Sequence, residues 1–107
     1  MKSDQKFISN LDRVIRQNYA NPNFDISGMA AEMKISDRQL QRKVKTFAGH
    51  SPVQYLRQFR LEKSLQFLGD GVPVGEVAKA VGFSSHAYFS SCFKAKFGFT
   101  PSRMQEN

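Results

Sequence analysis

The chain has 107 residues, a length that suits one compact domain or two very small subdomains that share a core. Hydrophobic residues make up 40% of the chain and ten residues are Phe, which argues against disorder. Its 16 Lys and Arg outnumber the nine Asp and Glu, and the net charge of +7 favours a polyanionic partner, although solubility or a membrane surface also explains some basic domains.

The sequence contains no signal for membrane insertion or for covalent cross-links. No stretch approaches the roughly 18 apolar residues of a spanning helix, and no apolar segment follows the polar start as in a signal peptide. We therefore expect a soluble protein of the cytoplasm, associated with the nucleoid and not with a membrane. Cys92 is the only cysteine, so an internal disulfide and a two-thiolate metal site are excluded.

Turn signals divide the chain into seven helical segments and no credible strand, so the expected fold class is all-α. Apolar residues at helical spacing predict a first helix over about residues 4–19. Asp25 is expected to cap a short helix that runs through Met33. Ser36 is expected to cap a third helix, which Gly49 ends.

A long fourth helix is predicted from Ser51-Pro52 to about Leu68, because proline is favoured at the first helical position. Its apolar residues form two opposite stripes, which predicts a helix lying between two halves: Val53, Leu56, Phe59 and Phe67 on one side, and Leu61, Leu65 and Leu68 on the other. Three more helices are predicted over about 74–81, over about 85–97, and after Thr100-Pro101.

Residues 29–36 resemble residues 77–84 at an offset of 48, and the match continues at an offset of 49 from Leu40 onward. Each copy has the features of a helix-turn-helix: a small residue where two helices cross, a tight turn, an inward apolar residue and a serine that restarts a helix. Ala30 and Ala78 are the small residues, Lys34 and Gly82 take the turn, and Ile35 and Phe83 point inward. A helical hairpin without a DNA role is the alternative for either copy alone.

The outer face of the third helix carries only long hydrogen-bond donors. With Leu40, Val44 and Phe47 as the buried stripe, the opposite face holds Arg38, Gln41, Arg42 and Lys45, and no acid. Arg38, Gln41 and Arg42 are predicted to read DNA bases, because Arg can bond guanine and Gln can bond adenine through two atoms each. Ser36 and Lys45 are assigned to DNA phosphate.

In the second copy, the equivalent face carries short side chains. Phe89 and Phe93 point inward, and we expect Ala87, Ser90 and Ser91 to meet bases and Lys94 to meet phosphate. His86 is a further candidate for base contact, with a solvent-facing position as the equal alternative. This half is therefore expected to discriminate less between sequences.

Other chemistries find no support in the sequence. His50, His86 and Cys92 do not have metal-ligand spacing, and no nucleophile has a supporting base, so we expect no enzyme, metal or cofactor. Cys92 is expected to be a partly buried, unreactive thiol. The long helix also carries three cations: Arg57, Arg60 and Lys63. They could contact the DNA backbone, but a structural role is equally well supported, with a cation beside Glu62 or lying across the ring of Phe59.

From about Phe7 to Met104 the sequence resembles the DNA-binding domain of the AraC/XylS family of transcription regulators. The resemblance is carried by the following motifs: Ser36-x-x-x-Leu40-x-Arg42-Lys43-Val44-Lys45, Gly49-His50-Ser51-Pro52, Arg60-Leu61, Val81-Gly82-Phe83, Tyr88-Phe89, Phe93-Lys94, Phe97-Gly98 and Thr100-Pro101. It implies one domain over 1–107, with helix-turn-helix subdomains at 4–49 and 74–106 joined by a long helix at 51–68. It also implies sequence-specific promoter binding.

Two positions depart from the family pattern. Ser64 stands where a small apolar Ala is common, and Ser91 stands where some relatives carry a base-reading Arg. The second departure agrees with the weaker second face.

The resemblance also implies a larger protein. The opening Asp4-x-x-Phe7-Ile8-x-x-Leu11 and Asn21-Pro22-Asn23-Phe24 are similar to the junction that follows a phosphorylation receiver. We thus expect the C-terminal output domain of a two-component or hybrid-kinase regulator, although small stand-alone members exist. The isolated domain is expected to be a monomer, the intact protein to be able to dimerise through another domain, and RNA polymerase to be a possible partner.

The leading hypothesis is sequence-specific binding of double-stranded promoter DNA, with two recognition helices in successive major grooves. A connecting helix of about 17 residues spans roughly 25 Å, which with the helix widths approaches the roughly 34 Å between such grooves. The alternatives are a protein-interaction module that docks on polymerase or another regulator, and a non-specific nucleic-acid binder.

Overall fold

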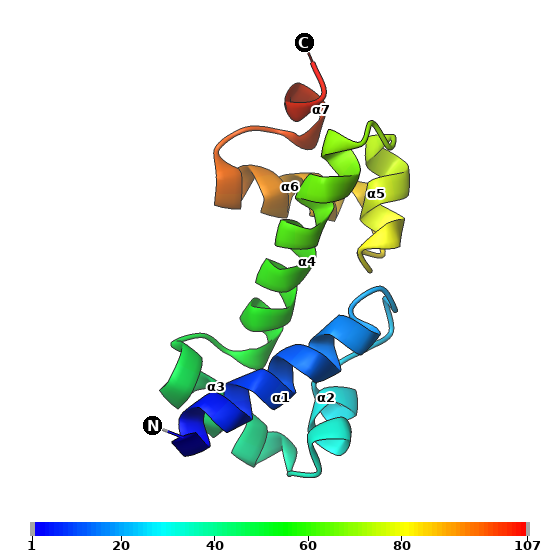
Figure 1. The fold of residues 1–107 in the computed structure, drawn as a ribbon. Coiled ribbons are helices and arrows are strands. Elements are labelled where there is room, and N and C mark those ends of the chain that lie inside the picture. Colours follow the sequence, from blue (N-terminus) through cyan, green and yellow to red (C-terminus); the bar gives the residue numbers. More distant parts are fainter. Residues whose placement is uncertain (1, 107) are drawn as a thin grey trace. The chain divides into compact units, whose positions relative to one another are not determined.

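The computed structural model describes residues 2–106, and over this range it contains seven helices and no strand (Figure 1). The predicted all-α fold class is thus confirmed. The helices are α1 (Lys2–Asn18), α2 (Ile26–Met33), α3 (Asp37–Ala48), α4 (Pro52–Gly69), α5 (Val74–Ala80), α6 (His86–Phe97) and α7 (Pro101–Met104). None of the helices in the described part of the chain has the length and apolar composition of a transmembrane span.

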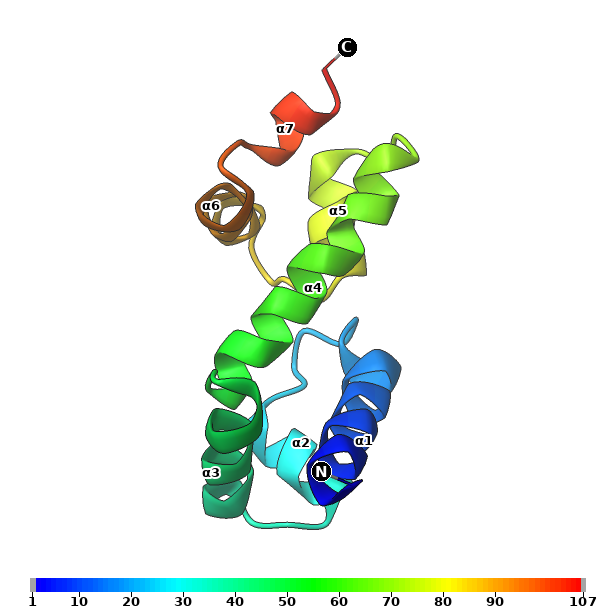
Figure 2. The same cartoon turned by 60° about the vertical axis from the view of Figure 1, so that its left-hand side comes forward.

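The first of two compact units contains α1, α2, α3 and the beginning of α4, and it extends to Gln58 apart from the three residues 20–22. The first three helices pack against one another, as two views of the ribbon show (Figures 1 and 2). The apolar residues of α1 recur at helical spacing and therefore form one stripe. The core of the unit consists of Leu11, Val14, Ile15, Met29, Ala30, Met33, Leu40, Val44 and Leu56, all buried.

The second unit contains the rest of α4 together with α5, α6 and α7, and aromatic rings form much of its core. Phe89 and Phe93 on α6 are fully buried. The ring of Phe89 lies 5.2 Å from that of Phe83, and the ring of Phe93 lies 4.6 Å from that of Phe97, in tilted arrangements. Tilted ring pairs are favourable for aromatic quadrupoles, so this stack stabilises α6 in its place.

Helix α4 is divided between the two units near Gln58. Leu61 and Leu68 are buried in the second unit, as the predicted stripes require. Ser64 is also fully buried, and its hydroxyl donates to the carbonyl of Leu61, so its polar atom is satisfied within the helix.

The predicted burial of Val53 is wrong, because this residue is 53% exposed. It lies in the first turn of α4, where the preceding Pro52 takes the buried position. A residue one step along a helix points about 100° away, so Val53 faces solvent.

The predicted caps are present. The Asp25 side chain accepts from the Gly28 N–H at 2.9 Å, and Ser85 and Thr100 accept in the same way at α6 and α7. Ser51 accepts from the Gln54 N–H, while the Gln54 side chain accepts from the Ser51 N–H. This reciprocal pair is a capping box, and it fixes the start of α4.

The two copies of the repeat make their tight turns with the same hydrogen bonds. Ile35 N–H donates to the Ala30 carbonyl at 3.1 Å, and Phe83 N–H donates to the Ala78 carbonyl at 2.9 Å. The turn residue is left-handed in both, with φ of 62° at Lys34 and 93° at Gly82. The copies differ in the next residue, because Phe83 is buried as predicted but Ile35 is only partly buried and lines a groove.

Lys34→Gly is predicted to stabilise the chain by about 0.5 to 1 kcal/mol. Glycine removes the steric cost of the left-handed conformation, which exceeds the entropy that it adds to the unfolded chain. Urea unfolding followed by circular dichroism measures the effect. The matched control is Lys79→Gly in α5, which should destabilise by about 1 kcal/mol because its backbone is helical. A loss of stability in Lys34→Gly would contradict the account.

Candidate nucleic-acid interface

Helix α3 is fixed in the first unit by two fully buried side chains one turn apart, Leu40 and Val44. Its first turn is closed by a capping box in which Ser36 Oγ accepts from the Gln39 N–H and Gln39 Oε1 accepts from the Ser36 N–H, both at 3.1 Å. The Ser36 hydroxyl can still donate its own proton outward. The opposite face of α3 is therefore held in a single orientation.

The four side chains predicted on this outer face, Arg38, Gln41, Arg42 and Lys45, are all exposed. The acid of α3, Asp37, accepts a hydrogen bond from the Ser27 hydroxyl on α2 at 2.8 Å. An acid in the first turn is also favourable for the helix dipole. The outer face is thus cationic and rich in donors, while the carboxylate is directed to α2.

Lys45 lies near the end of the same face, with its Nζ 3.5 Å from the Gly49 carbonyl oxygen. A cation at this place is favoured by the carbonyls that end a helix. Its exposure leaves the ammonium within reach of an external anion.

The predicted burial of Phe47 is wrong, because Phe47 is 37% exposed. The ring lies in the last turn of α3 and packs edge-on against Phe7 of α1 at 5.6 Å, so only part of it is covered. Lys43 Nζ lies 5.5 Å from the centre of the same Phe7 ring. Through these two contacts, one side of α3 packs against Phe7 of α1.

Helix α6 has a different outer face on the same kind of frame. Phe89 and Phe93 are buried at the positions that correspond to Leu40 and Val44. The predicted residues Ala87, Ser91 and Lys94 are exposed, and Ser90 is partly exposed. Apart from Lys94, these side chains are short, so they reach less far than their counterparts on α3.

Two residues of the first turn of α6 add features that the sequence pattern did not predict. The exposed side chain of His86 lies beside Gly75 of α5. A side chain added at Gly75 would place its Cβ 3.6 Å from Nδ1 of His86. Tyr88 is 51% exposed and its ring lies 5.8 Å from that of Phe83. When the two copies are aligned at an offset of 49, Tyr88 corresponds to Gln39. Helix α6 therefore has the Ser85 cap but lacks the glutamine that completes the capping box of α3.

The cations of α4 have structural contacts. Arg60 Nη2 donates to the Asn21 carbonyl at 2.9 Å, and burial lowers the pKa of this guanidinium from its ordinary value. Lys63 Nζ lies 5.7 Å from the centre of the Phe59 ring. For these two residues the structural alternative is therefore supported.

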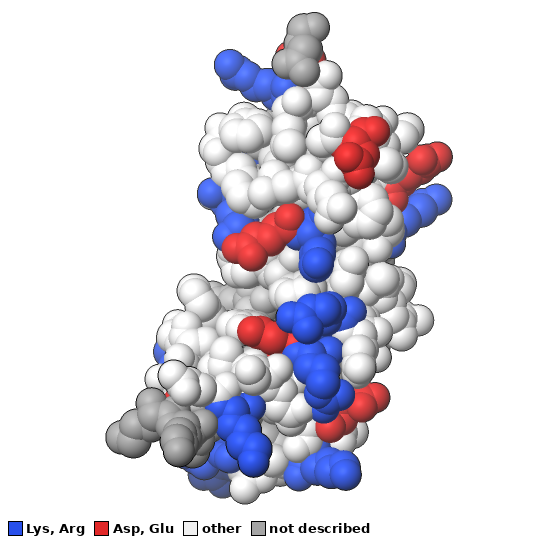
Figure 3. Space-filling model, in the orientation of Figure 1, with Lys and Arg blue, Asp and Glu red and all other residues white. Residues whose placement is uncertain are grey.

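Most of the basic residues belong to the first unit. On the face drawn in Figure 3, many Lys and Arg side chains lie over this unit, and acids lie among the bases over both units. Within residues 2–106, no group of three His, Cys, Asp or Glu side chains could hold a metal ion, and Cys92 is partly buried.

The sequence is similar to known proteins over most of its length. Residues 29–107 match the family model described as a helix-turn-helix domain. Histidine kinase P4 of Formosa agariphila is 30% identical over 103 residues, which cover 95% of this chain and 8% of that protein. The chain spans less than half the length of the curated relatives that it matches.

Two solved structures have the same fold over most of their length. The C-terminal domain of the two-component response regulator yesN from Fusobacterium nucleatum has a TM-score of 0.83 and 28% identity, covering 90% of this chain and 94% of that chain. The DNA-binding domain of AdpA, a global transcriptional factor crystallised with a target DNA, has a TM-score of 0.80 and 25% identity, covering 90% and 89%.

Proposed function

Because the chain belongs to the AraC-type family of helix-turn-helix DNA-binding domains, we propose that it recognises its DNA site mainly through α3. Sequence-specific DNA binding in a transcription regulator is the function of this family. The observation that carries the proposal is the outer face of α3, which presents Arg38, Gln41 and Arg42 from a helix fixed by Leu40 and Val44.

On α3, each side chain has a distinct role. Arg38 and Arg42 donate to guanine O6 and N7, and Gln41 pairs with adenine N6 and N7. Lys45 and the Ser36 hydroxyl bind phosphates at the two ends of the helix and set its register on the duplex. The α6 face meets bases through His86, Ala87, Ser90 and Ser91, and Lys94 binds phosphate.

The α6 face discriminates less, because a serine hydroxyl bonds several bases and an alanine methyl contacts only a thymine methyl. The two helices enter successive major grooves. The length of α4 supports this part of the proposal, since its 18 residues extend over about 27 Å at 1.5 Å per residue.

The intact protein is a signalling regulator in this proposal. The relatives include a histidine kinase and response regulators, which supports an output role in a phosphorelay in the cytoplasm. The isolated domain is a monomer, the intact protein dimerises through another domain, and it contacts RNA polymerase at the promoter.

Selection from random-sequence duplexes at about 150 mM salt tests the proposed function, because salt weakens non-specific phosphate binding most. We expect a long asymmetric motif. Unselective retention would indicate a non-specific nucleic-acid binder, and no retention would indicate a protein-interaction module; either result would overturn the proposal.

Arg42→Ala is predicted to cost about 1 to 3 kcal/mol on the selected duplex and much less on a scrambled duplex, because a base contact is lost. Competition binding on both duplexes measures the difference. Arg103→Ala in α7 is the control with the same change in charge. Equal losses on both duplexes in Arg42→Ala would reject base reading by this residue.

Lys45→Ala is predicted to weaken binding to all duplexes alike. A phosphate contact releases about one counterion, so the slope of log affinity against log salt should fall by about one unit. A salt titration of the variant and the parent chain gives both slopes, and identical slopes would contradict the assignment.

A further inference from the structure

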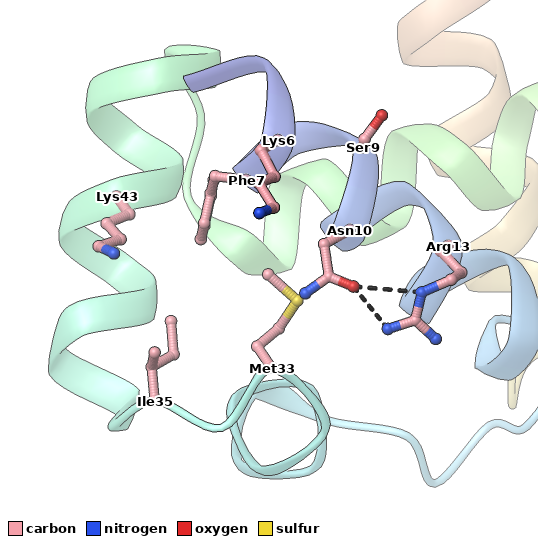
Figure 4. Close-up of a pocket in the computed structure, with 8 residues that line it drawn as sticks. All are labelled: Lys6, Phe7, Ser9, Asn10, Arg13, Met33, Ile35 and Lys43. Atoms are coloured by element: carbon pink, nitrogen blue, oxygen red, sulfur yellow. Dashed lines mark hydrogen bonds between the residues drawn. The ribbon is translucent and has the colours of Figure 1, made fainter. Parts of the chain in front are cut away.

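A groove of about 690 Å³ lies within the first unit, among α1, the end of α2 and α3 (Figure 4). Three apolar side chains line it: Phe7 from α1, Met33 from α2 and Ile35 from the turn. Phe7 and Ile35 remain partly exposed, so the floor offers apolar surface that this unit does not cover. Such a floor can receive an apolar side chain from a partner.

Three cations surround this apolar floor, Lys6 and Arg13 on α1 and Lys43 on α3, and none of the eight lining residues is acidic. Arg13 donates to the side-chain oxygens of Asn10 and Gln17, which are neutral amides. Lys43 lies over the Phe7 ring. These contacts hold Arg13 and Lys43 in place without cancelling their charge, and Lys6 is exposed, so the rim complements an acidic partner.

The spacing of the cations indicates the size of that partner. Lys6 and Arg13 are seven residues apart on one helix, which corresponds to about 10 Å at 1.5 Å per residue. Figure 4 shows Lys43 on one side of the floor and Arg13 on the other. One carboxylate cannot reach both places, whereas carboxylates spaced along a polypeptide can.

The groove is separate from the face assigned to DNA. At 100° per residue, Lys43 projects about 160° around the α3 axis from Gln41 and Lys45, about 140° from Arg38 and about 100° from Arg42. A partner in the groove would therefore leave the base-reading face open.

From these observations we propose that the groove docks an acidic amphipathic polypeptide segment. One apolar side chain of the segment inserts between Phe7, Met33 and Ile35, and flanking Asp or Glu side chains pair with Lys6, Arg13 and Lys43. The proposal goes beyond DNA recognition, because it assigns a second surface that works with DNA bound or absent.

The probe is a fluorescein-labelled helical peptide of about 14 residues, with Leu on one face and Glu on the other. Anisotropy titration of the 107-residue chain at about 150 mM salt should give saturable binding. A peptide with Leu replaced by Ser and one with Glu replaced by Lys should each bind at least about fivefold more weakly. Absence of binding, or equal binding of all three peptides, would overturn the proposal.

Charge-reversal variants locate the site. Lys43→Glu and Lys6→Glu should each weaken the Leu/Glu peptide at least about fivefold, whereas Lys79→Glu on α5, with the same change of net charge, should alter it less than twofold. Circular dichroism confirms that each variant is folded, and two variants on different helices guard against a local defect. Equal effects of all three variants would show attraction by net charge and reject the groove.

A final titration separates this surface from the DNA face. With the selected duplex bound, the peptide should bind with its affinity changed by less than about threefold, because the two surfaces lie apart on α3. Displacement of the peptide by the duplex would place it on the DNA face and contradict the proposal. If no duplex is selected, the titrations without DNA still decide the case.

Discussion

The structure depends on the way in which two buried side chains, one helical turn apart, hold each proposed recognition helix. Leu40 and Val44 fix α3, and Phe89 and Phe93 fix α6. A helix held at two levels cannot rotate about its axis without exposing apolar surface. The opposite face is thus presented in one orientation, which base reading requires, because a bidentate hydrogen bond tolerates little rotation.

The two copies of the repeat meet this constraint by different means. The first has aliphatic anchors, a lysine in the left-handed turn and a complete capping box at Ser36. The second has aromatic anchors, a glycine in the turn and Tyr88 in place of the capping glutamine. The shared scaffold leaves the outer faces free to differ, with long donors on α3 and mostly short side chains on α6. In our account, the first copy contributes most of the sequence specificity.

Much of this arrangement could be predicted from the sequence, because helix spacing and caps are local properties. The errors arise where burial depends on how a residue packs against its neighbours, which helical spacing alone does not give. Val53 and Phe47 both have the helical spacing of core residues. Pro52 takes the buried position next to Val53, and Phe7 covers only part of the Phe47 ring. The position of His86 against Gly75 and the groove beside Phe7 depend on how separate helices pack, which periodicity does not contain.

The most direct test of the unequal copies is a binding profile of the selected duplex in which every base pair is substituted in turn. Our account predicts that costs of about 1 to 3 kcal/mol per substitution cluster in one half of the site, and that Arg42→Ala removes the cost at one position of that half. Substitutions in the other half should cost well under about 1 kcal/mol each. Equal costs in both halves would contradict the claim that the first helix-turn-helix carries most of the specificity.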